Sequence, residues 1–442
     1  MKNMTISQEF KSVLKSILIE ALTEFDHLCS TEKVPLKVVP RLSVDGHGIT
    51  YRSEETEPDI QLFLLHTRKY IASSPVYQKF CRSVESDPVL GNWVNKYLGT
   101  VEGKRILTVY EIFYSFFEHY FEKNHDKTSF DEDLFERIWK DLDNFLTNKK
   151  LTIHYQAVLE NFDMEIDKIE LDSRIVIRRF RPGEVKEMWN ENSLFRQCYP
   201  FPSLRTFPAG ELKGLVEAFV EMEILISDTL QVPEPQISSP YDLIERQFSL
   251  TLTLLRLLKP GIVWIGPMMS ETSHFFHKSI SLIGIPVSRR IPRSKYIIEV
   301  SDIEDLKLIW SALNKIDWMK NRALTLGLTR LNFAYERLIP EDKLIDSFIA
   351  FEALVLSDLS SSREKEGLRR GLSVRIAQLL GVKYEDQERI KRTIRQGYTL
   401  RSNVVHGRKL ESTNYEIIEK VFDLCRETAR ELVTAASKSD ET

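Results

Sequence analysis

The spacing of apolar residues changes twice along this chain, near residue 149 and again near residue 301. Before residue 149 most apolar residues recur every three or four positions, which is typical of amphipathic helices. Between residues 149 and 300 strand-like stretches surround one strongly apolar helical stretch, and after residue 300 the strand signals disappear. A length of 442 residues suggests about three domains. We therefore predict a mainly helical α+β protein divided into residues 1–148, 149–300 and 301–442.

The first two parts differ in their balance of helix and strand. Residues 1–148 are predicted to be mostly helical, and their role is left open. The exception is residues 35–51, where alternating apolar residues flank Asp45-Gly46 as in a β-hairpin. The middle part combines a helix over residues 241–258 with predicted strands at residues 151–162, 168–180, 214–225 and 294–300.

The third part is predicted to be entirely helical. Its apolar residues follow helical spacing in six stretches, residues 303–314, 321–338, 341–357, 364–381, 384–405 and 413–437. Gly381 and Gly407 stand where helices commonly end. Six short amphipathic helices joined by brief connections indicate a compact helical bundle.

The composition excludes several classes of protein. A hydrophobic fraction of 42% provides enough apolar material for large cores and rules out a mainly disordered chain. The four cysteines lie far apart without a CxxC pair, which disfavours a disulfide framework or structural zinc and indicates a reducing cytoplasm. Because no segment approaches about 20 apolar residues, we expect a cytoplasmic protein without a membrane span. Nucleotide-binding, zinc-peptidase and hydrolase motifs are absent, and we expect neither a metal nor a cofactor.

The formal net charge of −4 argues against a nucleic-acid-binding protein, but it conceals an uneven distribution. Residues 363–409 contain 13 basic and 5 acidic residues, a net of +8, which leaves −12 for the rest of the chain. Such a basic stretch is what binding to a phosphate backbone requires. We expect RNA contacts from Arg392, Arg395, Arg408 and Lys409. The alternative is a solvated helix face that pairs with the acidic parts of the chain.

Within this basic stretch, Arg401 and His406 stand near the predicted end of a helix. An arginine can bind a phosphate and neutralise charge that develops at phosphorus, and a histidine can transfer a proton near neutral pH. Together they suffice for metal-free cleavage of RNA. Because one histidine cannot easily act as both acid and base, a symmetric dimer that supplies two would suit the chemistry. The alternative is structural, since a histidine before a C-cap glycine is common where helices end.

Other histidines and acidic residues carry weaker signals. His274 and His277 have helical spacing for a metal, but no third ligand is evident nearby, which favours a structural role. His119 and His125 flank an aromatic helix, and packing or surface roles are favoured for both. The acidic run at residues 131–133 is best interpreted as the first turn of a helix, where it complements the helix dipole.

The C-terminal third resembles the Apea-like HEPN domain over about residues 320–437. The resemblance rests on three segments in order, LTRLNFAYERLIPEDKLIDSFIAFEALVLS, EKEGLRRGLSVRIAQLLG and IKRTIRQGYTLRSNVVHGR. HEPN domains are helical bundles, and many are metal-independent endoribonucleases with an arginine followed a few residues later by a histidine. Two protomers pair so that both motifs line one cleft. The strand-rich middle part is also similar to what commonly precedes this domain.

Carried onto this sequence, the resemblance implies that Arg401 and His406 are the catalytic pair of a homodimeric RNA-cleaving enzyme that leaves a 2′,3′-cyclic phosphate. Ser402 occupies the polar position after the arginine, where many members have Asn, Asp or His. Glu352 matches a core acid of the family and is expected to support the site, in an ion pair with Arg375 or Arg401. The remaining expected supporting residues are Asn403 and Tyr398.

The resemblance also implies a biological role and an alternative. Many HEPN ribonucleases act in prokaryotic defence, where they cut host or invader RNA in a toxin-like manner and halt growth. Other members have lost catalysis and serve in RNA binding or dimerisation. We therefore expect either a HEPN endoribonuclease or a catalytically silent module that binds RNA or a partner protein.

Overall fold

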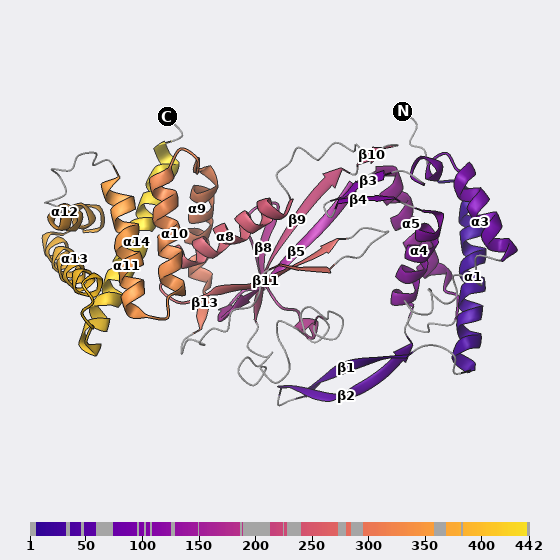
Figure 1. The fold of residues 1–442 in the computed structure, drawn as a ribbon, viewed down its shortest axis with the longest axis horizontal. Coiled ribbons are helices and arrows are strands. Elements are labelled where there is room, and N and C mark those ends of the chain that lie inside the picture. The colour runs from indigo at the N-terminus through magenta and orange to yellow at the C-terminus, as the bar shows by residue number, and fades with distance from the viewer. Residues whose placement is uncertain are drawn as a thin grey trace.

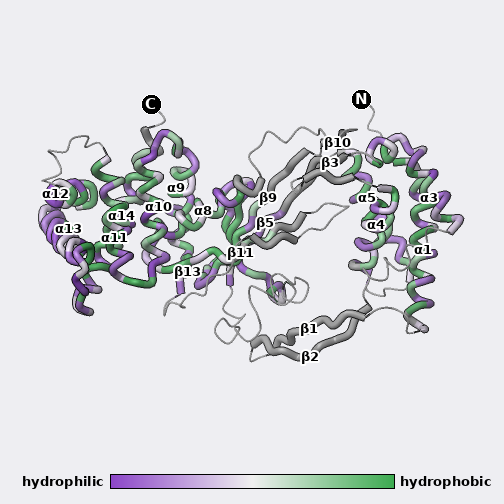
Figure 2. Tube along the Cα trace, in the orientation of Figure 1, coloured by the Kyte–Doolittle hydropathy of each residue, from purple (hydrophilic) through white to green (hydrophobic). Residues whose placement is uncertain are grey.

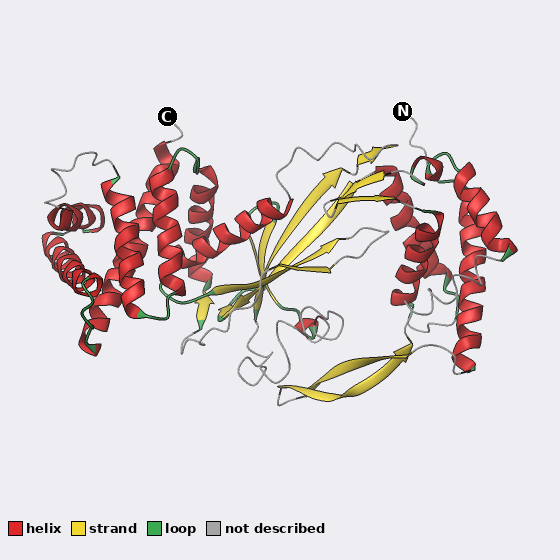
Figure 3. Cartoon of the chain, in the orientation of Figure 1, coloured by secondary structure: helices red, strands yellow, loops and turns green. Residues whose placement is uncertain are grey.

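A computed structural model shows helices at both ends of the chain and a β-sheet between them (Figure 1). The N-terminal helices and the C-terminal helices lie on opposite sides of the sheet, and helices outweigh strands, so the fold is mainly helical α+β (Figure 3). The structure describes residues 6–31, 36–45, 48–58, 74–94, 97–100, 103–106, 108–124, 129–148, 150–185, 188, 213–223, 225–227, 240–272, 280–283, 295–357, 368–381 and 383–439.

The N-terminal helices pack around aromatic side chains. They are α1 (Gln8–Ser30), α3 (Pro75–Ser86), α4 (Val109–Lys123) and α5 (Glu132–Asn148). Phe10 lies 5.5 Å from Phe80 and 5.8 Å from Trp139 between ring centroids, which joins α1, α3 and α5. Thr108 and Glu111 form a capping box that satisfies the first free N–H groups of α4. Asp131 caps α5 at Leu134 N–H, so the acidic run does begin a helix as predicted.

Short strands interrupt this helical part. The predicted hairpin is confirmed as β1 (Leu36–Asp45) and β2 (Gly48–Pro58), which pair antiparallel with Asp45 opposite Gly48. The sequence did not predict the second hairpin, β3 (Tyr97–Thr100) and β4 (Gly103–Ile106). These strands are only four residues long and contain glycines, which weaken the strand signal. Strand β10 (Leu225–Ser227) pairs with β3, so the chain of the middle part returns to the N-terminal part.

The central sheet has six antiparallel strands in the order β12-β11-β5-β9-β8-β7. The strands are β5 (Lys150–Glu160), β7 (Lys168–Glu170), β8 (Ile175–Arg179), β9 (Gly214–Glu223), β11 (Trp264–Thr272) and β12 (Ile280–Ile283). Two further strands, β6 (Phe162–Met164) and β13 (Tyr296–Ile298), form a small parallel pair beside it. Three of the four predicted strand regions are confirmed, residues 168–180 form the antiparallel pair β7 and β8 in place of one strand, and β11 and β12 were missed.

The two faces of the central sheet differ in polarity because side chains alternate along each strand. On one face Tyr155, Ala157, Val216 and Ile177 are buried in the core. The opposite face carries Gln156 directly beside Glu217. Charged and polar side chains form a hydrogen-bonded network on this polar face.

Helix α8 (Pro240–Leu258) joins the sheet to the C-terminal helices. Its last carbonyl groups, on Leu257 and Leu258, accept hydrogen bonds from Arg426 and Arg430 of α14 (Tyr415–Ser439). Cationic side chains at this position satisfy free carbonyls and oppose the negative end of the helix dipole. The buried Arg256 donates to the Asn332 carbonyl and side-chain oxygens at 3.2 and 2.9 Å, which fixes α8 against α10 (Arg322–Glu336).

The C-terminal helices agree closely with the sequence prediction. They are α9 (Ile303–Lys315), α10 (Arg322–Glu336), α11 (Pro340–Leu356), α12 (Leu368–Leu380), α13 (Tyr384–Val405) and α14 (Tyr415–Ser439). Helix α11 is central and contacts α10, α12, α13 and α14. Its side chains Leu344, Phe348 and Phe351 are completely buried. The bundle therefore surrounds α11 and presents α13 at its outer side (Figure 1).

Candidate functional site

The predicted arginine and histidine lie at the C-terminal end of α13. Arg401 and Ser402 belong to the helix, and His406 is its C-cap residue. Gly407 takes a φ of +76° and donates to the Val404 carbonyl, while Arg408 N–H donates to the Asn403 carbonyl. This pair of hydrogen bonds is a Schellman motif, in which glycine adopts the left-handed conformation at no steric cost. The motif stops the helix at His406, whose side chain is exposed.

Arg401 is held between α11 and α13 with part of its hydrogen-bonding capacity unused. Its Nη2 lies 3.8 Å from Glu352 Oε1, and its Cζ lies 5.6 Å from the centre of the Tyr398 ring. Its Nε is buried and has no hydrogen-bond partner among the described residues. The side chain remains 26% exposed. Because Glu352 approaches only one nitrogen at a long distance, the guanidinium can still bind a phosphate.

The floor beneath Arg401 is tightly packed. The Tyr398 ring meets Phe348 of α11 edge to face, with 5.5 Å between ring centroids. A Cβ added to Gly397 would lie 2.5 Å from Val421 Cγ2 of α14, which is closer than real atoms approach. Glycine at this position therefore lets α13 lie directly on α11 and α14. The position of Arg401 is therefore determined more by the packing of α13 on α11 and α14 than by its ion pair with Glu352.

The supporting residues partly take the predicted positions. The ion pair predicted for Glu352 is formed with Arg401, whereas Arg375 donates to the Val355 carbonyl at 2.7 Å. Ser402 meets His406 through its backbone carbonyl, which accepts the His406 N–H at 3.1 Å. The side chain of Asn403 accepts a hydrogen bond from Arg408 at 3.3 Å.

The predicted RNA-binding residues are mostly exposed. Arg392, Arg408 and Lys409 are exposed, and α13 is mainly hydrophilic along its length (Figure 2). Arg395 is half-buried, and its Nε donates to Ser373 Oγ at 3.3 Å. Other basic residues of α13 are locally neutralised, since Lys391 pairs with Glu388 at 2.8 Å and Arg389 with Asp386 at 3.3 Å.

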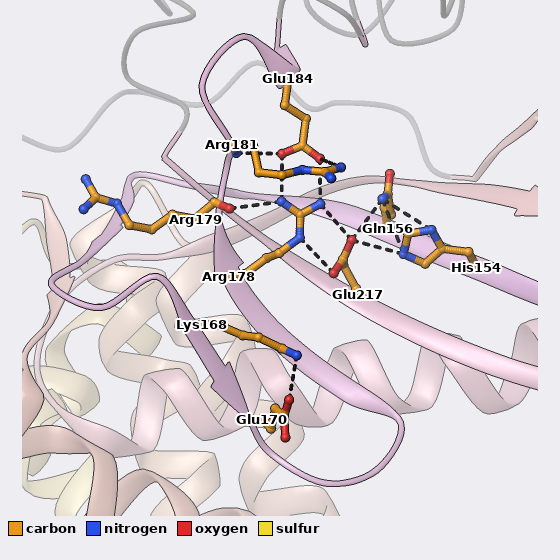
Figure 4. A network of polar contacts seen from close by, with 9 residues as sticks. All are labelled: His154, Gln156, Lys168, Glu170, Arg178, Arg179, Arg181, Glu184 and Glu217. Carbon is orange, nitrogen blue, oxygen red and sulfur yellow. Dashed lines mark hydrogen bonds and ion pairs between the residues drawn. The ribbon is translucent and has the colours of Figure 1, made fainter. Parts of the chain in front are cut away.

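A second polar cluster, which the sequence did not predict, lies on the polar face of the central sheet (Figure 4). Arg178 of β8 donates to both carboxylate oxygens of Glu184, at 2.6 and 2.7 Å, and also to Glu217 of β9. Glu217 in turn lies 3.1 Å from His154 Nε2 and accepts a hydrogen bond from Gln156 at 3.1 Å. We call these five residues the sheet network.

The electrostatics of the sheet network favour the charged forms. Burial alone would raise the pKa of Glu217, but hydrogen bonds from His154 and Arg178 outweigh it and hold the pKa at about 2. Burial likewise opposes ionisation of Glu184, and hydrogen bonds from Arg178 and the Arg181 backbone lower its pKa. The hydrogen bond to Glu184 raises the pKa of Arg178 further. Such saturated pairing is typical of a structural element.

Signals of the sheet network exist in the sequence, but they are weak. His154 and Gln156 alternate with apolar residues in β5, and Glu217 interrupts an apolar strand. Alternation indicates that these residues share a polar face. Their pairing depends on which strands are neighbours, and that information is not local.

Of the four histidines with weaker signals, His119 is the one that lies within the described residues. His274, His277 and His125 lie outside the described residues. His119 Nδ1 lies 2.8 Å from the Ser115 carbonyl within α4, as expected of a packing residue. Within the described ranges, no group of three or more His, Cys, Asp or Glu residues is arranged to hold a metal ion. None of the helices in these ranges combines the length and apolar character that crossing a membrane requires.

Comparison with known proteins finds no matching family model, no similar curated protein and no similar solved structure. The interpretation of the site therefore depends on its residues and their chemistry.

Proposed function

We propose that this protein is a metal-independent endoribonuclease of HEPN type, with residues 301–442 as the catalytic bundle and Arg401 and His406 as the catalytic pair. Residues 1–148 and 149–300 would form the helical and mixed α+β parts that regulate it or sense a target. The observation that carries the proposal is the combination of a positioned, incompletely paired Arg401 with an exposed His406 at the end of the same helix.

The chemistry assigned to each residue follows from its position. Arg401 would bind the scissile phosphate and stabilise the charge that develops on it, because its guanidinium lies against the Tyr398 ring and keeps free N–H groups. His406 would take the 2′-hydroxyl proton or donate one to the leaving oxygen. Attack of the 2′ oxygen on phosphorus expels the 5′ oxygen and leaves a 2′,3′-cyclic phosphate. Exposed Arg392, Arg408 and Lys409 would contact neighbouring phosphates.

The proposal includes a homodimer. Each chain offers one His406, and cleavage requires both a base and an acid. A second protomer that brings its own α13 end into the same cleft would supply the missing group. The resemblance to HEPN domains supports this arrangement and a role in cytoplasmic defence by RNA cleavage.

The alternative is a catalytically silent HEPN bundle that binds RNA or a partner protein. One observation favours it: Glu352 lies 3.8 Å from Arg401 and reduces the positive charge that a phosphate would meet. This alternative predicts salt-sensitive RNA binding, or a stable protein complex, without turnover.

Cleavage of single-stranded RNA in the presence of EDTA tests the proposal. The full chain should cut the RNA, and His406→Ala should lower the rate by roughly 10² to 10⁴, as expected for loss of a general acid or base. His27→Ala is a matched control, because His27 is also an exposed histidine in the last turn of a helix. Equal rates for His406→Ala and the parent chain would refute the catalytic assignment. Salt-sensitive binding without any cleavage would identify the silent alternative.

A further inference from the structure

The solvent-facing side of α10 carries a row of arginines and apolar residues. Arg322, Leu326, Arg330 and Phe333 are spaced by three or four residues, so they share one face of the helix, and Arg337, its C-cap residue, lies beside Phe333. We call these five residues the α10 stripe. The opposite side of α10 is buried against α11, α14 and α8. From first to last, the stripe spans roughly 22 Å at 1.5 Å per residue.

The apolar members of the stripe are unusually accessible. Leu326 is 46% exposed and Phe333 is 41% exposed. Single exposed apolar residues are common on protein surfaces. Phe333, however, has a guanidinium group from each of two arginines beside it: the Cζ atoms of Arg330 and Arg337 lie 5.7 and 6.0 Å from the centre of its ring. The stripe therefore presents an aromatic ring together with two planar cations.

The charge of the stripe is positive. Arg330 Nη1 and Arg337 Nε bind the two oxygens of Asp346, at 3.2 and 2.7 Å, so two guanidinium groups share one buried carboxylate. In the described part of the chain, Arg322 is exposed and forms no ion pair. Two further acidic residues lie near this face: Glu336, which pairs with Arg256 at 3.3 Å, and Asp342, whose charge acts on Arg337. Asp346 thus fixes the direction of two arginines without cancelling their charge.

The stripe ends near the same end of the bundle as the candidate site. It is followed directly by α11, whose first turns carry Lys343. Lys343 Nζ lies 3.0 Å from Glu419 Oε1 in α14, which begins a few residues after His406 and Lys409. The end of α13 and Arg337 therefore lie at the same end of the bundle, and one extended ligand can reach both.

We propose that the α10 stripe binds single-stranded RNA, as a contact surface outside the catalytic pair, and this inference rests on the proposed function for its substrate. Arginines would bind the phosphates, while unpaired bases would stack on Phe333 and on the guanidinium planes. An acidic protein segment would be attracted by the same charge. It would not use the stacking surfaces, and for this reason RNA is the occupant that the stripe fits best.

Fluorescence anisotropy with a labelled single-stranded RNA of mixed sequence tests the proposal. The full chain carrying His406→Ala serves as the parent, so that the RNA stays intact. Phe333→Ser should weaken binding roughly tenfold, since loss of one base stack removes about that much affinity. Arg322→Glu should weaken binding and reduce the slope of log affinity against log salt by about one or more. Neither change touches Asp346, so folding is retained and is checked by thermal unfolding.

Matched controls come from other exposed positions. Leu308→Ser, on α9, replaces an apolar residue that is more exposed than Phe333, and Arg137→Glu, on α5, reverses an exposed arginine. Both should bind RNA like the parent. Unchanged binding by Phe333→Ser and Arg322→Glu overturns the inference, and so does binding of polyglutamate in place of RNA. Stripe-dependent binding without cleavage by the chain that retains His406 would preserve this inference while the proposed catalytic function fails.

Discussion

Two arginines of this protein differ in how closely carboxylates pair with their guanidinium groups. Arg178, in the central sheet, binds both oxygens of Glu184 and also Glu217, and its side chain is only 13% exposed. Arg401, at the end of α13, has one distant carboxylate, Glu352, and a buried Nε without a partner among the described residues. The first is positioned by ion pairs, and the second is positioned by packing.

This difference separates a structural arginine from one that can bind a ligand. Every strong acceptor near Arg178 is already engaged with it, so binding a phosphate would require breaking a buried ion pair. Arg401 could bind a phosphate without losing a short hydrogen bond. The number of close ion pairs that an arginine already forms therefore separates these two residues better than burial does.

Replacing each arginine by alanine should lower the free energy of unfolding by very different amounts. Arg178→Ala leaves Glu184 and Glu217 without their shared cation, and should lower the free energy of unfolding by about 3–5 kcal/mol. Arg401→Ala removes only a long, half-exposed ion pair and should cost about 1 kcal/mol or less. Urea unfolding of both variants measures these values. Similar losses for the two variants would contradict the distinction between them.

Acidification should weaken the sheet network. The pKa of Glu217 is about 2 in the folded protein, below its usual value of 4.5, so its stabilisation is present above about pH 4.5 and is lost as the pH falls toward 2. The loss is on the order of 3 kcal/mol. Urea midpoints at several acidic pH values should fall more steeply for the wild type than for Glu217→Gln.

Two glycines test whether packing positions Arg401. Gly397→Ala places a methyl group against Val421 and Phe348, and should cost about 1–3 kcal/mol and weaken RNA binding by displacing α13. Gly371, on α12, has nothing within 4 Å of an added Cβ, so Gly371→Ala should stabilise the helix by about 0.5–1 kcal/mol. Thermal unfolding compares the two. A stable Gly397→Ala variant with normal RNA binding would show that Arg401 is positioned in another way.

The smallest effect is expected from Glu352. An exposed ion pair contributes about 0.2–1 kcal/mol, so Glu352→Gln should change the free energy of unfolding by no more than this. Removing the negative charge beside Arg401 should raise the affinity for single-stranded RNA about two- to fivefold. Titration of the RNA at fixed salt measures the change. Weaker binding would mean that Glu352 holds Arg401 in its binding position.

The sequence predicts the C-terminal bundle well because its information is local. Leu344, Phe348 and Phe351 repeat at helical spacing and are all buried, so the periodicity alone identifies α11 and its inner face. Gly407 likewise marks the end of α13. The same local signals placed Arg401 and His406 at one helix end, whereas the ion pair of Glu352 with Arg375 or Arg401 was expected from the resemblance to HEPN domains.

The central part is predicted less completely because its contacts are distant in sequence. Strand β11 follows a strongly apolar helix and contains Pro267, so its signal merges with that of α8. The sheet network joins His154, Arg178 and Glu217, which meet only because β5, β9 and β8 are neighbours in the sheet. Strand order is decided by the whole fold, and no window of sequence contains it.

The two arginines of α14 that bind the end of α8 have a mechanical consequence. Arg426 and Arg430 bind the last carbonyls of α8, and only a few residues separate these carbonyls from β11, which lies between β12 and β5 in the sheet. A rotation of α14 must either break these hydrogen bonds or carry the sheet with it. Motion of the bundle relative to the sheet therefore costs these two hydrogen bonds, so the contact between α14 and α8 resists such motion.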